Sequence, residues 1–218
     1  METVLSDMTN TKQVKTKKRV ADHGEVFTND REVNAMLDLV KHETERIDSR
    51  FLEPACGNGN FLAEVLRRKL ERVDSRYSKS QLEWERYAFI ALSSIYGVEI
   101  LQDNTIECQN RLFDIFSKSY LKMFGVNAKM ELLKGVRFLL EKNIIWGDAT
   151  NYCIPNTTKP IIFCEWIPIG DFIQRKDWVY EFLAEGSYQI SIFDENNEAQ
   201  NFDKSIKDYK PIHFLKLR

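Results

Sequence analysis

The sequence predicts a parallel α/β sheet, chiefly because short apolar runs alternate with longer amphipathic segments. The apolar runs cover residues 50–53, 94–100, 143–146 and 160–163. Parallel strands require long crossover connections, usually helices, so this alternation favours parallel pairing. A second observation is that an acidic residue lies at or within two residues of the end of each run, and a third is that two glycines follow the first run. Together they predict a ligand site at the carboxyl ends of the strands.

The composition restricts the class of protein. The chain has 218 residues, of which 43% are apolar, so it can bury a hydrophobic core. Its formal net charge of -2 does not indicate a globally basic nucleic-acid binder. No apolar run approaches the roughly 20 residues that span a bilayer, and the polar N-terminus lacks the apolar region of a secretory signal. We therefore expect a cytoplasmic protein without a membrane segment.

Metal and histidine chemistry are not expected. Cys56, Cys108, Cys153 and Cys164 form no C-x-x-C pair, so the spacing of a zinc site is absent. The chain has 3 histidines, and none lies in a recognisable catalytic pattern. We expect neither a metal nor a disulfide framework, as suits an intracellular chain.

The first 22 residues are polar and rich in cations: Lys12, Lys15, Lys17, Lys18 and Arg19. We interpret residues 1–22 as a flexible basic segment that precedes a single domain over residues 23–218. Such a segment is either a solvated tail or an arm that contacts phosphates, and its charge and flexibility suit both roles.

Helical spacing predicts the elements that follow. A helix begins at Asp30, whose side chain can cap it, and continues through Arg46. Further helices, expected on both faces of the sheet, cover residues 61–73, 81–93, 104–124 and 130–142. Beyond residue 185 the pattern weakens. Residues 188–193 alternate like a strand, and residues 212–217 are a candidate edge strand.

Acidic residues follow the four predicted strands in succession: Glu53, Glu99, Asp148 and Glu165. Because the carboxyl ends of parallel strands meet at one edge of a sheet, we expect these side chains to lie close together. A single carboxylate at a strand end is common in a turn or a helix cap. Four in succession indicate a binding site.

A glycine-containing turn joins the first strand to its helix, in the pattern Glu53-Pro54-x-x-Gly57-x-Gly59-x-Phe61. Glycine lets the chain adopt positive φ and approach a ligand closely, and the helix that follows offers free N–H groups. A dinucleotide-binding loop has a third glycine, which is absent here, and Glu53 would repel phosphates. The turn therefore favours a ligand that carries positive charge and hydroxyl groups.

This strand, turn and helix resemble those of the class I S-adenosylmethionine-dependent methyltransferases, in particular the adenine-specific DNA methyltransferases (modification subunits) of restriction-modification systems. Residues 51–62, FLEPACGNGNFL, are similar to that family's first motif. Residues 23–28, HGEVFT, are similar to a family segment that closes over the methionine end of the cofactor, although Asn29 stands where proline is usual. The likeness covers residues 23–150 and implies a Rossmann-like class I methyltransferase fold.

The resemblance also implies a set of residues that would bind S-adenosylmethionine: Phe27, Thr28, Glu53, Pro54, Gly57, Gly59, Phe61, Glu99 and Asp148. In that assignment Glu53 contacts the amino group of the methionine moiety. Glu99 accepts hydrogen bonds from the ribose hydroxyls, and Asp148 accepts one from the adenine amino group. A carboxylate that accepts from hydroxyl groups forms strong, charge-assisted hydrogen bonds, which agrees with these roles.

The motif that would carry catalysis is altered. Amino-methylating members have (D/N/S)-P-P-(Y/F/W) after the fourth strand, whereas residues 164–168 are CEWIP in this chain. In the family motif, an oxygen and a carbonyl accept the hydrogens of the target amino group, and the aromatic ring stacks on the flipped base. Glu165 as acceptor and Trp166 as stacking surface are thus the candidate catalytic residues. In the alternative interpretation the motif has degenerated and Trp166 only packs.

The expected function is therefore S-adenosylmethionine-dependent methylation of adenine in DNA, by direct in-line transfer and without a metal. One alternative is a catalytically deficient cofactor-binding or DNA-associated subunit that requires a partner chain, and another is an RNA or protein methyltransferase. The residues after Trp166 are too few for a separate target-recognition domain. We therefore expect a specificity or partner subunit, and a sheet that is incomplete at its C-terminal strands.

Overall fold

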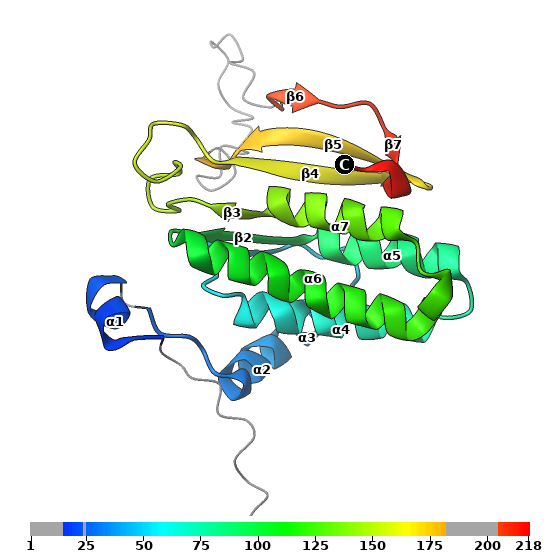
Figure 1. Cartoon of the computed structure of the whole chain (residues 1–218), viewed down its shortest axis with the longest axis horizontal. Helices are drawn as coiled ribbons and strands as arrows, with labels where there is room; N and C mark the ends of the chain where they lie inside the picture. Colours follow the sequence, from blue (N-terminus) through cyan, green and yellow to red (C-terminus); the bar gives the residue numbers. More distant parts are fainter. Residues whose placement is uncertain (1–14, 24, 182–204) are drawn as a thin grey trace, which may run out of the picture.

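The structure is a computed structural model, and it describes residues 15–23, 25–181 and 205–218. Within these ranges it has a three-stranded parallel sheet, a separate antiparallel sheet and several long helices (Figure 1). The structure therefore confirms the prediction of a mixed α/β protein with a parallel sheet. The strand expected at 188–193 lies outside the described residues. No helix in the described part of the chain is both long and apolar enough to cross a bilayer.

The parallel sheet consists of β1 (Phe51–Glu53), β2 (Ile95–Glu99) and β3 (Ile144–Trp146), in the order β1-β2-β3. The register aligns Glu53 with Gly97 and Glu99 with Trp146, so the three strands run in one direction and end at one edge. All 5 residues of β2 are buried, as is typical of a strand with neighbours on both sides.

The observed helices agree closely with the spacing of the apolar residues. They are α1 (Lys17–His23), α2 (Asp30–Leu39), α3 (Lys41–Thr44), α4 (Asn60–Tyr77), α5 (Gln81–Ser93), α6 (Gln102–Phe124) and α7 (Met130–Asn143), with a 3-10 turn η1 at Gly125–Asn127. α5 begins and ends where the sequence predicts, while α4 continues past Val73. From Lys17 the chain forms a helix where the sequence analysis expects a flexible tail.

Asn29, rather than Asp30, caps α2. Its side-chain oxygen accepts a hydrogen bond from the backbone N–H of Glu32 at 3.0 Å, and Asp30 is the first helical residue. The helix ends at Leu39, because Val40 leaves the helical conformation with φ -115°. The single helix predicted over residues 30–46 is therefore two helices, α2 and α3.

The fourth predicted strand does not join the parallel sheet. β4 (Ile162–Ile169) pairs antiparallel with β5 (Phe172–Val179), and β5 also pairs with β6 (Lys207–Asp208) and β7 (Ile212–His213). Gly170, with φ +59°, and Asp171 form a two-residue turn that reverses the chain directly. The prediction of a parallel strand ending at residue 163 is wrong for this reason. Likewise, only part of the strand expected over 212–217 forms, since η2 (Phe214–Lys216) follows β7.

An aromatic contact joins the two sheets. The ring of Tyr96, on β2, lies 5.5 Å from that of Phe163 on β4, and its hydroxyl donates to the carbonyl of Cys164 at 3.0 Å. On the opposite face of β2, Gly97 lies against Leu62 of α4. Figure 1 shows the same layers, with α4 and α6 on one side of the parallel strands and β4 and β5 on the other. The second sheet therefore occupies a face where the sequence analysis expects helices.

A buried lysine fixes the amino ends of the strands. Lys69 of α4 is fully buried, and its Nζ donates to Ile47 O at 2.9 Å, Ser49 O at 2.6 Å and the Ser94 hydroxyl at 2.7 Å. Ser49 lies just before β1, and Ser94 immediately precedes β2. Lys69 therefore ties α4 to the amino edge of the parallel sheet, while the turns that follow the strands gather at the carboxyl edge.

Candidate functional site

The turn between β1 and α4 depends on two glycines. Gly57 has φ +52° and Gly59 has φ +81°, both in the left-handed region that favours glycine. A Cβ atom on Gly57 would lie 3.2 Å from the ring of Phe27, and one on Gly59 would lie 2.5 Å from the Sγ of Cys108. Gly59 is also the N-cap of α4 and offers no side-chain cap. The first N–H groups of that helix are therefore not satisfied by an N-cap side chain.

Glu99, at the end of β2, holds this turn in place. Its side chain is buried: Oε2 accepts from the backbone N–H of Gly57 at 2.8 Å, and Oε1 accepts from that of Leu101 at 2.9 Å. These charge-assisted hydrogen bonds fasten the turn to the start of α6. A carboxylate oxygen can accept about two hydrogen bonds, so each oxygen of Glu99 retains acceptor capacity for a ligand.

Glu53, at the end of β1, has no such partners. Its Oε2 is buried and has no hydrogen-bond partner within the described residues. Burial, with a smaller contribution from the charge of Glu99, raises the pKa of Glu53 to about 7. Asn58, between the two glycines, is 6% exposed; its Nδ2 donates to Glu107 at 3.0 Å, but its Oδ1 is also buried without a partner there. The turn and the adjoining strand end thus carry two unsatisfied acceptors.

The upstream segment lies against the same turn. Phe27 is buried, and its ring packs on Gly57. Thr28 is exposed, and its carbonyl accepts from Asn60 Nδ2 at 3.0 Å. Phe61 is half-buried and packs on the hydrophobic core. Of the two aromatic residues in the predicted set, Phe27 therefore contacts the turn. Phe61, at the start of α4, contacts the hydrophobic core.

Asp148 and Pro54 also follow parallel strands, but their surroundings differ from those of the two glutamates. Asp148 Oδ1 accepts from the N–H of Thr150 at 2.9 Å and from its hydroxyl at 2.6 Å, and Oδ2 accepts from Asn151 at 3.0 Å. The hydrogen bonds from Thr150 hold the pKa of Asp148 below its usual value. Asp148 thus stabilises its own turn. Pro54 is exposed in the turn after β1.

Glu165 and Trp166 lie at the opposite, amino edge of the sheet. Glu165 Oε1 pairs with Arg50 Nη2 at 2.6 Å, and Arg50 immediately precedes β1. Trp166 is buried, and its Nε1 donates to Oδ1 of Asn143, which immediately precedes β3, at 2.7 Å. The prediction that Glu165 lies close to Glu53 and the other strand-end acids is therefore wrong, and Trp166 is separated from them as well. The antiparallel course of β4 carries Glu165 and Trp166 to the other end of the parallel strands.

Two polar residues of this edge were missed by the sequence reasoning. Asn58 occupies a variable position of the glycine motif, although a polar side chain inside a tight turn is itself a signal of local hydrogen bonding. Glu107, its partner, lies just beyond the first turn of α6. Acidic residues are common on exposed helix surfaces, so Glu107 gives no signal of a special role. No sequence pattern connects the two, because the contact joins residues that are far apart in the chain.

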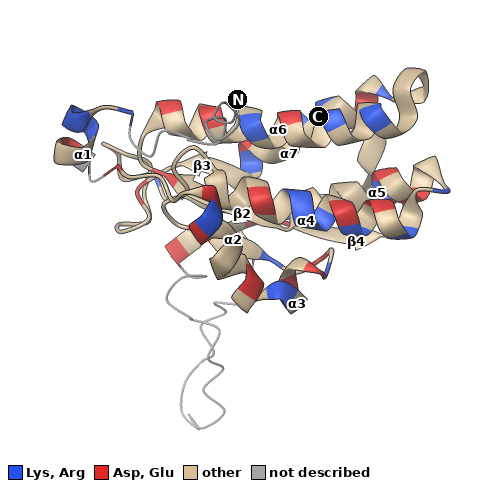
Figure 2. Ribbon diagram, turned by 90° about the horizontal axis from the view of Figure 1, so that it is seen from below, with Lys and Arg blue, Asp and Glu red and all other residues tan. Residues whose placement is uncertain are grey.

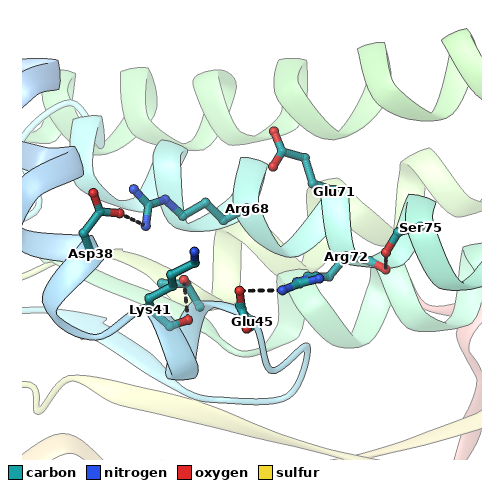
Figure 3. A pocket seen from close by; sticks show the side chains of 8 residues that line it. Asp38, Lys41, Glu45, Arg68, Glu71, Arg72 and Ser75 are labelled. Carbon is teal, nitrogen blue, oxygen red and sulfur yellow. Dashed lines mark hydrogen bonds and ion pairs between the residues drawn. The ribbon is translucent and has the colours of Figure 1, made fainter.

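Two surface cavities lie away from this edge. One, of about 290 Å³, lies between α4 and the pair α2 and α3, and ion pairs such as Arg68–Asp38 at 2.8 Å cross it (Figure 3). The other, of about 480 Å³, lies at the amino edge and is lined in part by Arg50 and Trp166. Neither is lined by residues of the glycine turn. The unsatisfied acceptors, rather than the cavity volumes, therefore indicate the candidate site.

The structure brings five of the predicted residues together at the carboxyl edge: Phe27, Glu53, Gly57, Gly59 and Glu99. It places Thr28, Pro54, Phe61 and Asp148 in the adjoining segments and separates Glu165 and Trp166 from them. No protein-family model, curated protein or solved structure matches this chain. The chemistry of this edge is therefore the basis for inferring the function.

Proposed function

We propose that this chain binds S-adenosylmethionine at the carboxyl edge of its parallel sheet and acts in methyl transfer. The observation that carries the proposal is a pair of buried acceptors at the glycine turn, Glu53 Oε2 and Asn58 Oδ1, which have no partner within the described residues. Buried acceptors without donors cost free energy, so a ligand that supplies donors at this place is favoured. The cofactor carries an ammonium group, a sulfonium charge and two ribose hydroxyls, which supply the positive charge and the donors that these two acceptors lack within the described residues.

The local geometry fits such a ligand. A Cβ atom on Gly59 would collide with Cys108 and one on Gly57 would crowd the ring of Phe27, so this turn packs against both neighbours only with glycine at the two positions. In the proposed complex Glu53 accepts from the ammonium group, and Glu99 accepts from the hydroxyls with its remaining capacity. The ring of Phe27, packed on the turn, would help exclude water from the bound methionine moiety.

When bound, S-adenosylmethionine supplies an electrophilic methyl group. The chain's own contribution is to bind and orient it, and the acceptor we propose from the family resemblance is an adenine amino group in DNA. Figure 2 shows acidic and basic residues interspersed along α4, α5 and α6. The surface of these helices is therefore not a broad basic face, and it provides only weak long-range attraction for DNA.

A second candidate function is favoured by one specific observation. Glu165 and Trp166, the expected acceptor and stacking residues, lie at the amino edge, where they contact Arg50 and Asn143. Methyl transfer requires the target nitrogen to lie in line with the methyl group at contact distance. If no other residues of the chain replace them, the chain binds the cofactor and a partner chain supplies the groups that position the target base.

Calorimetric titration with S-adenosylhomocysteine tests the binding step. We expect the parent protein to bind, Gly57→Val to abolish binding, and Glu53→Gln to weaken it by at least about tenfold. Glu71→Gln, an exposed position on α4, is the matched control and should leave the affinity unchanged. Absence of binding by the parent protein would reject the proposal.

Transfer of a tritiated methyl group separates the two candidates. Incorporation into mixed-sequence DNA by this chain alone supports a complete DNA methyltransferase. Binding without incorporation into DNA, RNA or protein supports the partner-dependent function. Incorporation into RNA or protein only would reject DNA as the target while retaining the cofactor assignment.

A further inference from the structure

A buried carboxylate lies in the segment that precedes the glycine turn. Glu25 is 9% exposed and accepts three hydrogen bonds: from Arg19 Nε at 2.5 Å, from Arg19 Nη2 at 2.8 Å and from Asn104 Nδ2 at 2.6 Å. Burial alone would raise its pKa, but the hydrogen bonds from Arg19 and Asn104 outweigh burial and lower it. Glu25, two residues before Phe27, is therefore an ionised carboxylate that accepts hydrogen bonds from both Arg19 and Asn104.

Arg19 connects this carboxylate to α6. Besides its two bonds to Glu25, its Nη1 donates to Asp103 Oδ2 at 2.6 Å, and its Nη2 donates to Asp103 Oδ1 at 3.1 Å. Asp103 lies in the first turn of α6, the helix that starts directly beyond Glu99. Figures 1 and 2 both show α1, which carries Arg19, beside this end of α6. One guanidinium group thus joins the upstream segment to the carboxyl edge.

A parallel connection reaches the glycine turn itself. Lys15 Nζ donates to Asn104 Oδ1 at 2.7 Å and pairs with Glu107 at 2.5 Å. Glu107 also accepts from Asn58 of the turn, and Asn104, which is 1% exposed, bonds to Glu25. Two cations of the segment that the sequence predicts to be flexible, Lys15 and Arg19, are therefore part of a network that ends on the candidate site.

We propose that Arg19 is a positioning residue for the cofactor site: by joining Glu25 to Asp103, it holds Phe27 over the glycine turn. This inference rests on the proposed function, because it assigns the network a role in cofactor affinity. Isolated surface ion pairs contribute little. Here one carboxylate is buried and receives three donors, so removal of Arg19 leaves Glu25 with a single donor and frees the segment that carries Phe27.

The test compares Arg19→Met with Lys18→Met, an exposed cation on the same helix. Hydrogen exchange of the backbone amides at residues 25–28, measured without ligand, reports the anchoring of the segment. Calorimetry with S-adenosylhomocysteine reports the affinity. We expect Arg19→Met to accelerate exchange and to weaken binding, each by about tenfold or more. Asp103→Asn should act in the same direction, and Lys18→Met should leave both within about twofold of the parent.

Three results would overturn the inference. If Arg19→Met accelerates exchange but binds as tightly as the parent, the network is only structural and the proposed function stands. If Lys18→Met changes the exchange rate and the affinity as much as Arg19→Met does, the effect comes from the loss of any positive charge on α1 and not from the contacts of Arg19. If the parent protein does not bind the ligand, the proposed function fails and this inference fails with it. An unchanged thermal midpoint in Arg19→Met would show that weaker binding does not arise from unfolding.

Discussion

Two glutamates that end neighbouring strands have opposite surroundings. Glu99 is satisfied by the backbone N–H groups of Gly57 and Leu101, whereas Glu53 has a buried oxygen without a partner in the described part of the chain. The difference arises from position: Glu99 lies between the turn after β1 and the start of α6, which present the backbone N–H groups of Gly57 and Leu101 to it. Glu53 has the negative charge of Glu99 nearby instead, and burial raises its pKa to about 7.

Glu53 should make the folded protein less stable as the pH rises. Its pKa is about 7 when folded and 4.5 in the reference state, so between these values the folded state binds more protons. The free energy of unfolding therefore falls as the pH rises from 4.5 through 7. We expect Glu53→Gln to be more stable than the parent by about 1–3 kcal/mol at pH 8, with no difference at pH 4.

Urea unfolding at several pH values checks this expectation, with Glu71→Gln as the matched exposed control on α4. The control should follow the parent curve. Equal pH dependence in Glu53→Gln and the parent would show that Glu53 is not held in its neutral form by burial.

Gly59 should tolerate a side chain less well than Gly170, although both have positive φ. A Cβ on Gly59 would lie 2.5 Å from Cys108 Sγ, whereas nothing lies within 4 Å of one on Gly170. Gly170→Ala therefore incurs backbone strain alone, about 1 kcal/mol, and Gly59→Ala incurs strain plus overpacking, about 2–4 kcal/mol. Thermal unfolding of the two variants gives the comparison. Equal destabilisation would contradict the tight contact with α6.

At the scale of an element, α4 serves both edges of the sheet. Its first turn follows Gly59 at the carboxyl edge, and Lys69, farther along the helix, reaches Ile47 O and Ser49 O at the amino edge. One helix thereby fixes the loops at both ends of β1. The site that the glycine turn forms depends on this helix as much as on the strand.

Lys69 should impose the opposite pH dependence to Glu53. Burial lowers the pKa of Lys69 to about 7 from 10.5, so between these values the unfolded state binds more protons. The free energy of unfolding should rise with pH in this range, by up to about 1.4 kcal/mol per pH unit. In Lys69→Met this contribution disappears, while Arg67→Met, an exposed position on the same helix, should retain it. Urea unfolding from pH 7 to 10 provides the test, and parallel curves for the parent and Lys69→Met would refute it.

At the scale of the whole molecule, the two edges of the parallel sheet differ in chemistry. The carboxyl edge has the glycine turn and unsatisfied acceptors, whereas the amino edge has satisfied groups such as Lys69 and the Arg50–Glu165 ion pair. β4 reaches the amino edge because the chain enters it near Gly147, which contacts Ile161, and then runs back against the direction of β3. The packing of the second sheet thus separates the predicted catalytic pair from the predicted cofactor site.

Variants at the amino edge should therefore not affect the proposed binding of the cofactor. We expect Glu165→Ala and Trp166→Phe to bind S-adenosylhomocysteine within about twofold of the parent. Trp166→Phe should nonetheless lose stability, about 1–3 kcal/mol, because Asn143 loses the indole donor. Calorimetry and urea unfolding on the same samples give both values. Weaker binding by Glu165→Ala, with an unchanged thermal midpoint, would instead show that Glu165 takes part in binding the cofactor.

Much of the fold and part of the site follow from local pattern. The bounds of α5, the turn at Gly57 and Gly59, and the convergence of Glu53 and Glu99 are all predicted, because periodicity and glycine placement act over a few residues. The N-cap was misplaced by one residue because Asn29 and Asp30 are both good caps. The role of Arg19 was missed because its partner Asp103 lies far away in the chain.

The three parallel strands and the edge where they end can be predicted from the sequence alone, since alternating strands and helices leave few ways to connect a sheet. The position of residues 162–169 cannot, because it depends on contacts that form only in the folded chain. A mostly apolar segment of eight residues has the same pattern whether its neighbouring strands are parallel or antiparallel, and its position depends on packing against distant residues such as Tyr96. Likewise, every strand-end carboxylate has the same charge in the sequence. Which of them accepts backbone hydrogen bonds, like Glu99, and which has a buried oxygen without a partner among the described residues, like Glu53, depends on the N–H groups that the fold brings beside it.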